Sequence, residues 1–312
     1  MNAETIELVV VGAGRMGRMH LRALADLASV RVRDVVDPSP SAQDWLTGNG
    51  FCAHPDLAHA LARRRPDGVL IAAPTDQHAR HVAEAVTAGI PVLCEKPAGT
   101  GVGELVRTGE LADGAGVGLQ IAYWRRYVPA LVDLRRAIRD GELGDLLHVE
   151  CAQWDLEPPP ASFRRTSGGI FVDMGVHEFD QIRWLTGRQI EGVQAAGTPC
   201  SDIAARPDVD SAQALLRLSG GVTATVSLGR HHPPGDLVTA EVFGTGGHRR
   251  VAVLDPVEGD LPMLEALRLQ ADSFARLIRT GVREGASVAD ATAAMDAAER
   301  AARALTGPVS DR

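Results

Sequence analysis

Lysine is almost missing from this chain of 312 residues. Lys96 is the only lysine among the 32 Lys and Arg side chains, so arginine supplies every other fixed positive charge. The two residue types differ at a reacting centre, because lysine is a compact ammonium whose pKa shifts readily, whereas arginine does not release its proton. Lys96 is therefore a candidate for chemistry, and the alternative is chance in an arginine-biased composition.

Long apolar runs and clustered cysteines are also missing. No run approaches the ~18 apolar residues of a membrane-spanning helix, and no basic stretch precedes the first apolar run, so we expect no membrane span and no signal peptide. The four cysteines stand singly without a C-x-x-C pair, which argues against a structural zinc site and a disulfide framework. We expect a cytoplasmic protein and, from the net charge of −8, no nucleic-acid partner.

Strand-like and helix-like segments alternate over the first part of the chain. The apolar strand patterns are 6–11, 30–36, 51–53, 68–73, 90–94 and 117–122. Amphipathic stretches separate them, and this alternation predicts a parallel sheet with right-handed crossovers. We expect a doubly wound, Rossmann-type domain at 1–122.

Strand patterns follow one another after about residue 140, with one helical stretch among them. The strand patterns are 146–154, 189–197, 209–218, 221–229, 237–243 and 248–254, and the helical stretch is 169–186. Two Ala-rich helical stretches close the chain, 262–281 and 288–305, and the second opens with a capping-box-like pair, Ser287 and Asp290. This pattern predicts an α+β domain at 123–312 with a mostly antiparallel sheet. Helix 288–305 is a candidate to pack back on the first domain.

A glycine-rich turn follows the first predicted strand and opens a helix. Gly12 permits a tight turn, Gly14 lets a pyrophosphate approach the helix N-terminus, and Gly17 lets the helix pack closely on the sheet. Asp37 follows Gly17 by 20 residues, at the end of the second strand, where a carboxylate binds adenosine ribose hydroxyls and repels a 2′-phosphate. We therefore expect NAD rather than NADP; the alternative is a glycine turn in an unrelated α/β protein.

Two further strand ends point to the same edge of the predicted sheet. Pro74-Thr75 and Glu95-Lys96 follow predicted strands, and ligands of open α/β sheets bind along the carboxyl ends of the strands. Besides the three glycines and Asp37, we expect further cofactor contacts from the glycine turn and from these two strand ends. They are Arg15, Met16, Pro74, Thr75, His78, Glu95 and Lys96.

The helical stretch 169–186 carries a histidine between two carboxylates. Asp173 and Asp180 lie four residues before and three residues after His177, so regular helical spacing would place all three on one face. Histidine titrates near neutral pH, which makes His177 a candidate general base. The alternatives are a structural ion-pair network, a hydrated helix face or a metal site. We expect no metal, because Gln181 interrupts the zinc-binding pattern H-E-x-x-H.

Four motifs together resemble those of the Gfo/Idh/MocA oxidoreductases. They occur in the family order: G-A-G-R-M-G from residue 12, A-P-T-D-Q-H from 73, C-E-K-P from 94, and S-G-G-I-F-V-D-M-G-V-H-E-F-D from 167. The resemblance covers nearly the whole chain, and its E-K-P and D-x-G-x-H-x-x-D elements are the specific ones. Within the family, the segments 123–127 and 154–160 are most similar to those of inositol 2-dehydrogenases.

The resemblance implies a Rossmann domain followed by a domain with an open sheet, in a homodimer or homotetramer. It implies hydride transfer between a carbinol carbon of a small polyol or sugar and the nicotinamide of NAD. Lys96 would donate to the reacting hydroxyl oxygen, His177 would take its proton, and Asp173 would orient it. The other substrate contacts that the resemblance implies are Trp124, Arg125, Asp155 and Asp180.

One segment departs from the inositol dehydrogenase pattern. Where those enzymes usually carry a Tyr-Gly-Tyr-Asp-like segment, this chain has His231-His232-Pro233-Pro234-Gly235-Asp236, and its only two tyrosines are Tyr123 and Tyr127. The substrate therefore stays open among inositols, aldoses, anhydrosugars, aminocyclitols and nucleotide-linked sugars, the last held by arginines such as Arg125, Arg126, Arg164 and Arg165. A non-catalytic NAD-sensing regulator is the alternative of another class.

Overall fold

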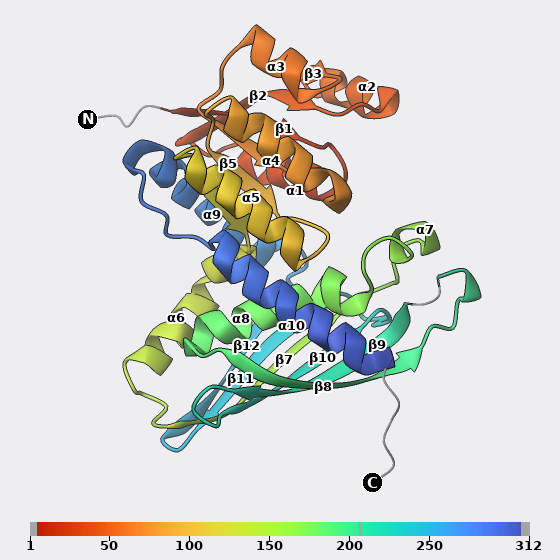
Figure 1. Ribbon diagram of the computed structural model, residues 1–312, viewed down its shortest axis with the longest axis vertical. Coiled ribbons are helices and arrows are strands. Elements are labelled where there is room, and N and C mark those ends of the chain that lie inside the picture. Colours follow the sequence, from red (N-terminus) through yellow and green to blue (C-terminus); the bar gives the residue numbers. More distant parts are fainter. Residues whose placement is uncertain (1–4, 206–207, 307–312) are drawn as a thin grey trace. The chain divides into compact units, whose positions relative to one another are not determined.

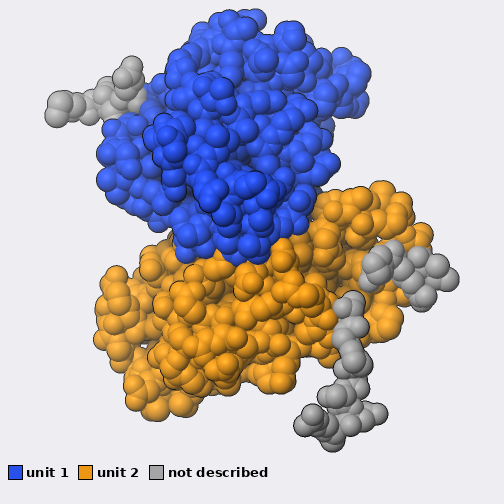
Figure 2. Space-filling model, in the orientation of Figure 1, with its two compact units in different colours: residues 1–124, 264–292 blue, residues 125–263, 293–312 orange. Residues whose placement is uncertain are grey.

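The chain forms two compact units. The computed structural model describes residues 5–205 and 208–306 (Figure 1). Unit 1 comprises residues 1–124 and 264–292, and unit 2 comprises residues 125–263 and 293–312 (Figure 2).

Unit 1 is built on a six-stranded parallel sheet with the order β3-β2-β1-β4-β5-β6. Its strands are β1 (Ile6–Val11), β2 (Val30–Val36), β3 (Cys52–His54), β4 (Gly68–Ile71), β5 (Val92–Glu95) and β6 (Leu119–Ala122). The order reverses between β1 and β4, which is the arrangement of dinucleotide-binding sheets, with ligands bound at the reversal. The predicted doubly wound domain is confirmed.

In the described part of this unit, six helices lie wholly or largely within it. They are α1 (Arg15–Leu24), α2 (Pro40–Gly48), α3 (Leu57–Arg63), α4 (His78–Thr87), α5 (Val102–Gly114) and α9 (Leu261–Thr280). The core joins residues of β1, β2 and α1, such as Val10 and Leu24, to Phe274 of α9. A side chain at Gly68 would come within 2.9 Å of the Phe274 ring, so α9 approaches β4 closely where the strand begins.

The first boundary, after residue 124, lies close to the predicted one at 122, but residues 264–292 also belong to unit 1, which the sequence does not predict. Helix α9 belongs to unit 1 because its buried apolar face completes the core of the parallel sheet. Helix α10 (Val288–Thr306) is divided: its first residues cluster with unit 1 and the remainder with unit 2. The guanidinium of Arg300 donates to the carbonyl oxygens of Ile190 and Glu191 in unit 2, at 2.8 and 3.2 Å. The predicted cap is present, since Ser287 and Asp290 each donate a backbone N–H to the other's side chain.

Unit 2 contains a six-stranded sheet with the order β12-β11-β7-β10-β9-β8. Its strands are β7 (Leu146–Trp154), β8 (Ile190–Pro199), β9 (Val209–Leu218), β10 (Thr223–Gly229), β11 (Leu237–Gly244) and β12 (Gly247–Leu254). Only β7 and β10 pair in parallel, and the other neighbours are antiparallel, as predicted. The parallel pair matters for the site, because the carboxyl ends of β7 and β10 lie side by side.

Three more helices cover or flank this sheet: α6 (Pro129–Arg139), α7 (Ala161–Arg164) and α8 (Val176–Thr186). Helices α6 and α8 pack against each other on one face of the sheet (Figure 1). The sequence pattern predicts only α8, which is preceded by a π-helical turn, Phe171–Gly175. Among residues 5–205 and 208–306, no helix is both long and apolar enough to cross a membrane.

Candidate active site

The turn after β1 has the geometry that a dinucleotide pyrophosphate needs. Gly12 has a φ of 99°, and a Cβ there would lie 2.5 Å from the carbonyl oxygen of Ala72. A Cβ on Gly17 would lie 2.0 Å from the carbonyl oxygen of Gly12. At Gly14 the space is open to 4 Å, and α1 begins without a side-chain cap or an acidic first turn. An anionic group can therefore approach the backbone amides at the start of α1.

Asp37 lies beside this turn. Its carboxylate accepts hydrogen bonds from the backbone N–H groups of Ala13 and Ser39, each at 2.9 Å. These bonds fix the carboxylate between the end of β2 and the glycine turn. The structure thus brings together Asp37 and the glycines, as the spacing predicts.

Lys96 follows β5 at the same edge of the sheet and is half-buried. The buried carboxylate of Glu95 supports it, accepting the backbone N–H of Lys96 at 3.1 Å while its other oxygen lies 2.7 Å from Nε2 of His20. Because His20 is on α1, Glu95 ties the lysine segment to the helix of the glycine turn. Glu95 therefore holds the backbone at Lys96, whereas the sequence predicts it only as a cofactor contact.

His78 connects two strand ends. Its ring is 1% exposed, with Nδ1 2.8 Å from the carbonyl oxygen of Pro97 and Nε2 2.8 Å from that of Ala73. Burial lowers the pKa of His78 against the opposing effect of these carbonyl groups. The ring thus fastens the segment after β4 to the segment after β5. The other candidate contacts at this edge are on or near the surface of the unit: Arg15 and Pro74 are exposed, and Met16 and Thr75 are half-buried.

The two carboxylates expected beside His177 are each paired with an arginine. Asp180 of α8 accepts two hydrogen bonds from Arg126, at 2.9 and 2.5 Å, and both side chains are largely buried. Asp173 pairs with Nη1 of Arg230 at 3.0 Å. Asp173 is in the π-helical turn, so α-helical spacing does not govern its direction relative to His177. His177 itself is 7% exposed.

A chain of contacts, buried at α8 and half-buried at Asp155, leads from one to the other. Arg125 donates to the carboxylate of Glu178 and, at 2.7 Å, to the amide oxygen of Gln153. The amide nitrogen of Gln153 then donates to Asp155 at 2.9 Å. Arg125 and Asp180 each have an ionic partner within unit 2, and their expected contact with the substrate stays a prediction. Trp124, in a short turn before this segment, is 4% exposed.

Asp155 lies at the carboxyl end of the parallel strand pair. Burial raises its pKa, and the negative charges of Asp236 and Asp173 add to this effect, against Gln153 and Arg230. The tyrosine-free segment 231–236 lies beside it, since His232 donates its backbone N–H to the Asp155 carbonyl and Asp236 accepts from the backbone of Leu156. This segment therefore borders the candidate substrate residues.

Replacing Asp155 with Asn should stabilise the folded protein at neutral pH. A carboxyl whose folded pKa is raised binds its proton more tightly in the folded state, so its contribution to stability falls as pH rises through the window above the unfolded pKa of 3.8. Asn keeps the acceptor for Gln153 and removes the charge. We expect the unfolding temperature at pH 7 to rise by roughly 1–3 °C, and the difference to shrink as the pH is lowered towards 4. A variant less stable than the parent at pH 7 would contradict this.

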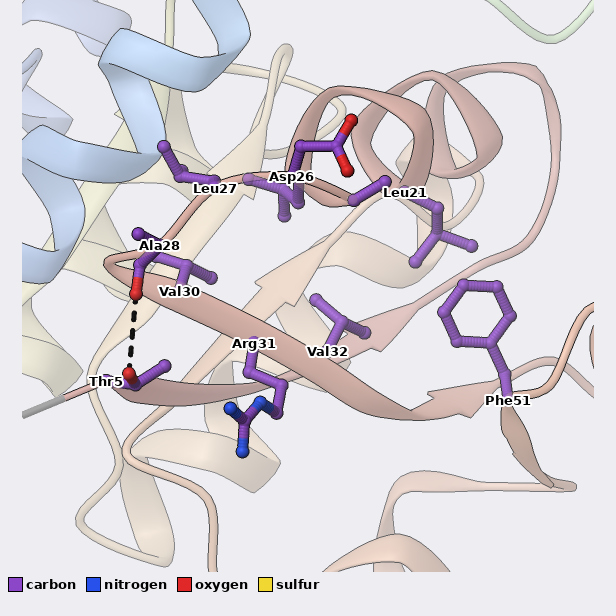
Figure 3. A pocket seen from close by; sticks show the side chains of 11 residues that line it. Thr5, Leu21, Asp26, Leu27, Ala28, Val30, Arg31, Val32 and Phe51 are labelled. Atoms are coloured by element: carbon purple, nitrogen blue, oxygen red, sulfur yellow. Dashed lines mark hydrogen bonds between the residues drawn. The ribbon is translucent and has the colours of Figure 1, made fainter.

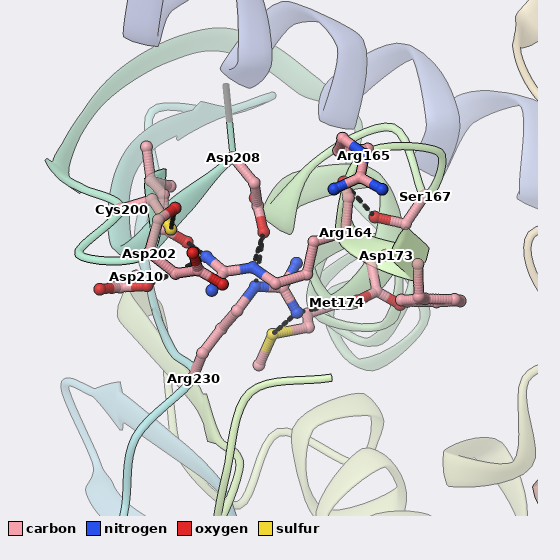
Figure 4. Close-up of polar contacts among 12 residues, drawn as sticks. Arg164, Arg165, Ser167, Asp173, Met174, Cys200, Asp202, Asp208, Asp210 and Arg230 are labelled. Carbon is pink, nitrogen blue, oxygen red and sulfur yellow. Dashed lines mark hydrogen bonds and ion pairs between the residues drawn. The ribbon is translucent and has the colours of Figure 1, made fainter. Parts of the chain in front are cut away.

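A second group of charges lies behind Asp173 (Figure 4). Arg164 donates to Asp208 at 2.7 Å and to Asp210 at 3.0 Å, and Arg230 approaches the same oxygen of Asp208 at 2.9 Å. Burial would raise the pKa of Asp210, but hydrogen bonds from Ser201 and Arg164 outweigh it and hold that pKa well below its usual range. Sequence reasoning misses Arg230. No local sequence pattern could have found it, because its place beside the end of β7 depends on how the strands pair.

Two hollows lie away from these residues. One of about 430 Å³ is lined by the end of α1, the following loop and the first residues of β2, including Leu21, Leu27 and Val30 (Figure 3). It lies at the amino end of β2, whereas Asp37 follows the carboxyl end. Another, of about 390 Å³, lies on the sheet of unit 2 over β8, β9 and β10. Within the described part of the chain, no group of three or more His, Cys, Asp or Glu residues could hold a metal ion.

Comparisons with known proteins agree with both units. Residues 6–123 match the oxidoreductase family with an NAD-binding Rossmann fold, and residues 131–250 match the GFO/IDH/MocA C-terminal domain. The chain is 43% identical to the rhizopine catabolism protein MocA of Rhizobium meliloti, over 96% of this chain and 95% of that protein. It is 35% identical to a myo-inositol dehydrogenase of Streptomyces leeuwenhoekii, over 77% of this chain and 75% of the other.

A solved structure extends the likeness to the fold. A putative myo-inositol dehydrogenase from Sinorhizobium meliloti superposes with a TM-score of 0.91 at 28% identity, covering 97% of this chain and 98% of that one. The glycine turn, the sheet order and these matches agree, and the chain belongs to the Gfo/Idh/MocA family of oxidoreductases, with an NAD-binding Rossmann domain.

Proposed function

We propose that the protein is an NAD-dependent dehydrogenase that oxidises a secondary hydroxyl of a cyclic polyol or sugar. The observation that carries the proposal is the position of Lys96. The only lysine of the chain follows β5, on the same edge of the parallel sheet as the glycine turn and Asp37, and Glu95 fixes its backbone. Relatives named as inositol dehydrogenases support the substrate class.

Three side chains act on the reacting hydroxyl group of the substrate. Lys96 donates a hydrogen bond to the reacting hydroxyl oxygen and stabilises its alkoxide character, as a fixed cation does for developing negative charge. His177 accepts the hydroxyl proton, and Asp173 orients the hydroxyl. The bound cofactor supplies the hydride acceptor, the nicotinamide ring. Asp155 and Trp124 contact the rest of the substrate, and the arginine-paired Asp180 and Arg125 support the wall of the site.

The test is turnover by the purified protein with a panel of substrates. We expect reduced cofactor to accumulate, measured by absorbance, with NAD and at least one inositol or related cyclic polyol. The panel includes aldoses, anhydrosugars, UDP-sugars, aminocyclitols and, because of the 43% identical relative, rhizopine. If no substrate of the panel is turned over while calorimetry shows that NAD still binds, the proposal is overturned and a non-catalytic NAD-sensing regulator is favoured.

An amine-bearing cyclitol is the second candidate substrate. Asp155 lies in the field of two further carboxylates, Asp173 and Asp236, which would attract an ammonium group. A nucleotide-linked sugar has less support. Of the arginines expected to hold its phosphates, Arg125, Arg126 and Arg164 are each paired with buried carboxylates in unit 2.

Replacing Asp37 with Asn should relax the choice of cofactor. Asn keeps oxygen and shape but removes the charge that repels a 2′-phosphate, so we expect the ratio of kcat/KM for NADP to that for NAD to rise at least about tenfold. Asp44→Asn, on the exposed side of α2, is the matched control and should leave the ratio unchanged. An unchanged ratio in the Asp37 variant would show that other residues select NAD.

As expected from the sequence, the protein would also form a homodimer or homotetramer and would be located in the cytoplasm. Leu215 on β9 is 49% exposed beside the shallow hollow over β8, β9 and β10, which suits a subunit contact there. Light scattering of the purified protein tests the oligomer.

A further inference from the structure

Arg230 joins a candidate catalytic carboxylate to a buried network. It follows β10 directly, and its backbone N–H donates to the carbonyl oxygen of Asp210, at 2.9 Å. The side chain is completely buried. One guanidinium nitrogen, Nη1, donates to Asp173 at 3.0 Å, and another, Nε, lies 2.9 Å from Asp208. The guanidinium therefore lies between two carboxylates: it donates a hydrogen bond to Asp173 and forms an ion pair with Asp208.

The exposure of these side chains falls from Asp173 inward. Asp173 is 17% exposed, Asp208 is 1% exposed and Arg230 is fully enclosed. Asp208 is in turn held by Arg164, itself 2% exposed at its side chain. Asp173 is therefore the most exposed member of the run Asp173–Arg230–Asp208–Arg164, and the other three side chains in that run are buried.

Two features separate Arg230 from an ordinary structural arginine. Its Nε and Nη2 are buried with no hydrogen-bond partner among the described residues, whereas most buried donors have one. Its partner Asp173 lies in a π-helical turn, a local departure from regular helix that is common at functional sites. The same turn takes Asp173 out of regular α-helical spacing, and Nη1 of Arg230 contacts its carboxylate there.

We propose that Arg230 is a positioning residue, which holds the carboxylate of Asp173 in the direction needed to orient the substrate hydroxyl, with Asp208 and Arg164 as its anchor. This inference rests on the proposed function for the role of Asp173. Arg230 acts through Asp173 and needs no contact with the substrate.

The first test compares Arg230→Lys and Arg230→Gln with Arg164→Lys. Lysine keeps the charge but cannot bridge Asp173 and Asp208, so we expect kcat to fall about 10–100-fold in both Arg230 variants, with unchanged NAD binding. Arg164→Lys disturbs the same network one step further from Asp173 and should lower the unfolding temperature with a much smaller loss of kcat. Values of kcat within about twofold of the parent in both Arg230 variants would overturn the proposal.

A double-mutant cycle with Asp173→Asn separates positioning from general destabilisation. If Arg230 acts through Asp173, Arg230→Lys has no further effect on kcat in the Asp173→Asn background. Independent losses that multiply would overturn the inference, whatever happens to the unfolding temperature.

If the parent protein turns over no substrate of the panel, that result refutes the proposed function but not the positioning role. A crystal structure of the Arg230→Lys variant, compared with one of the parent, then tests the positioning role. We expect the Asp173 carboxylate to leave its position in the parent. An Asp173 side chain in its original rotamer would overturn the positioning role, independently of any activity.

Discussion

Replacing Lys96 with Met is expected to lower kcat by about 10²–10⁴-fold while the affinity for NAD stays within about threefold. Met has a similar length but cannot donate to the reacting oxygen or stabilise its negative charge. The measurements are initial rates with a confirmed substrate and calorimetric binding of NAD. Lys96→Arg keeps a positive charge but replaces a compact ammonium by a planar guanidinium, so we expect it to remain strongly impaired.

The control is Arg107→Met, which removes an exposed cation from α5 of the same unit and should leave kcat unchanged. A Lys96→Met variant that turns over substrate within about threefold of the parent would remove Lys96 from the mechanism.

The rarity of lysine allows a chemical test of the same prediction. An amine-reactive label can modify only Lys96 and the chain's N-terminal amine, because no other lysine exists. The loss of activity should follow the fraction of labelled Lys96 measured by peptide mass spectrometry. Activity that survives complete labelling of Lys96 would contradict the proposed role.

The largest loss of stability is expected from Glu178→Gln. The Arg125–Glu178 pair is almost inaccessible to solvent, with side chains 4% and 0% exposed, so the variant leaves a buried guanidinium without its counter-charge. Removing one member of such a pair costs about 3–5 kcal/mol of unfolding free energy. Urea denaturation followed by circular dichroism measures this value.

Two further variants test whether the loss of stability comes from the unpaired buried charge. Arg217→Ala breaks an ion pair with Glu191 whose side chains are 65% and 44% exposed, and it should cost less than about 1 kcal/mol. The double replacement of Arg125 and Glu178 by Met should recover part of the loss, because no uncompensated charge remains. A Glu178→Gln variant as stable as the Arg217→Ala variant would show that the buried pair contributes little.

The sequence by itself determined the parts of this protein that depend on local pattern. The apolar spacing of β1, β2, β7 and β9 predicts these strands at the residues where they occur. The glycine turn and Asp37 lie together, since the turn and the following β-α-β unit fix their separation. The cap of α10 is equally local, as Ser287 and Asp290 are three residues apart.

Only the tertiary structure decided the partners of the candidate catalytic carboxylates and the assignment of α9. Asp173 and Arg230 are 57 residues apart, and Asp180 and Arg126 are 54 apart. No local pattern shows that β10 pairs in parallel with β7, which sets Arg230 beside the end of β7. An amphipathic helix such as α9 likewise does not specify which sheet its apolar face will cover. Periodicity and turn chemistry act within a few residues, whereas strand pairing and core packing select partners across the whole chain.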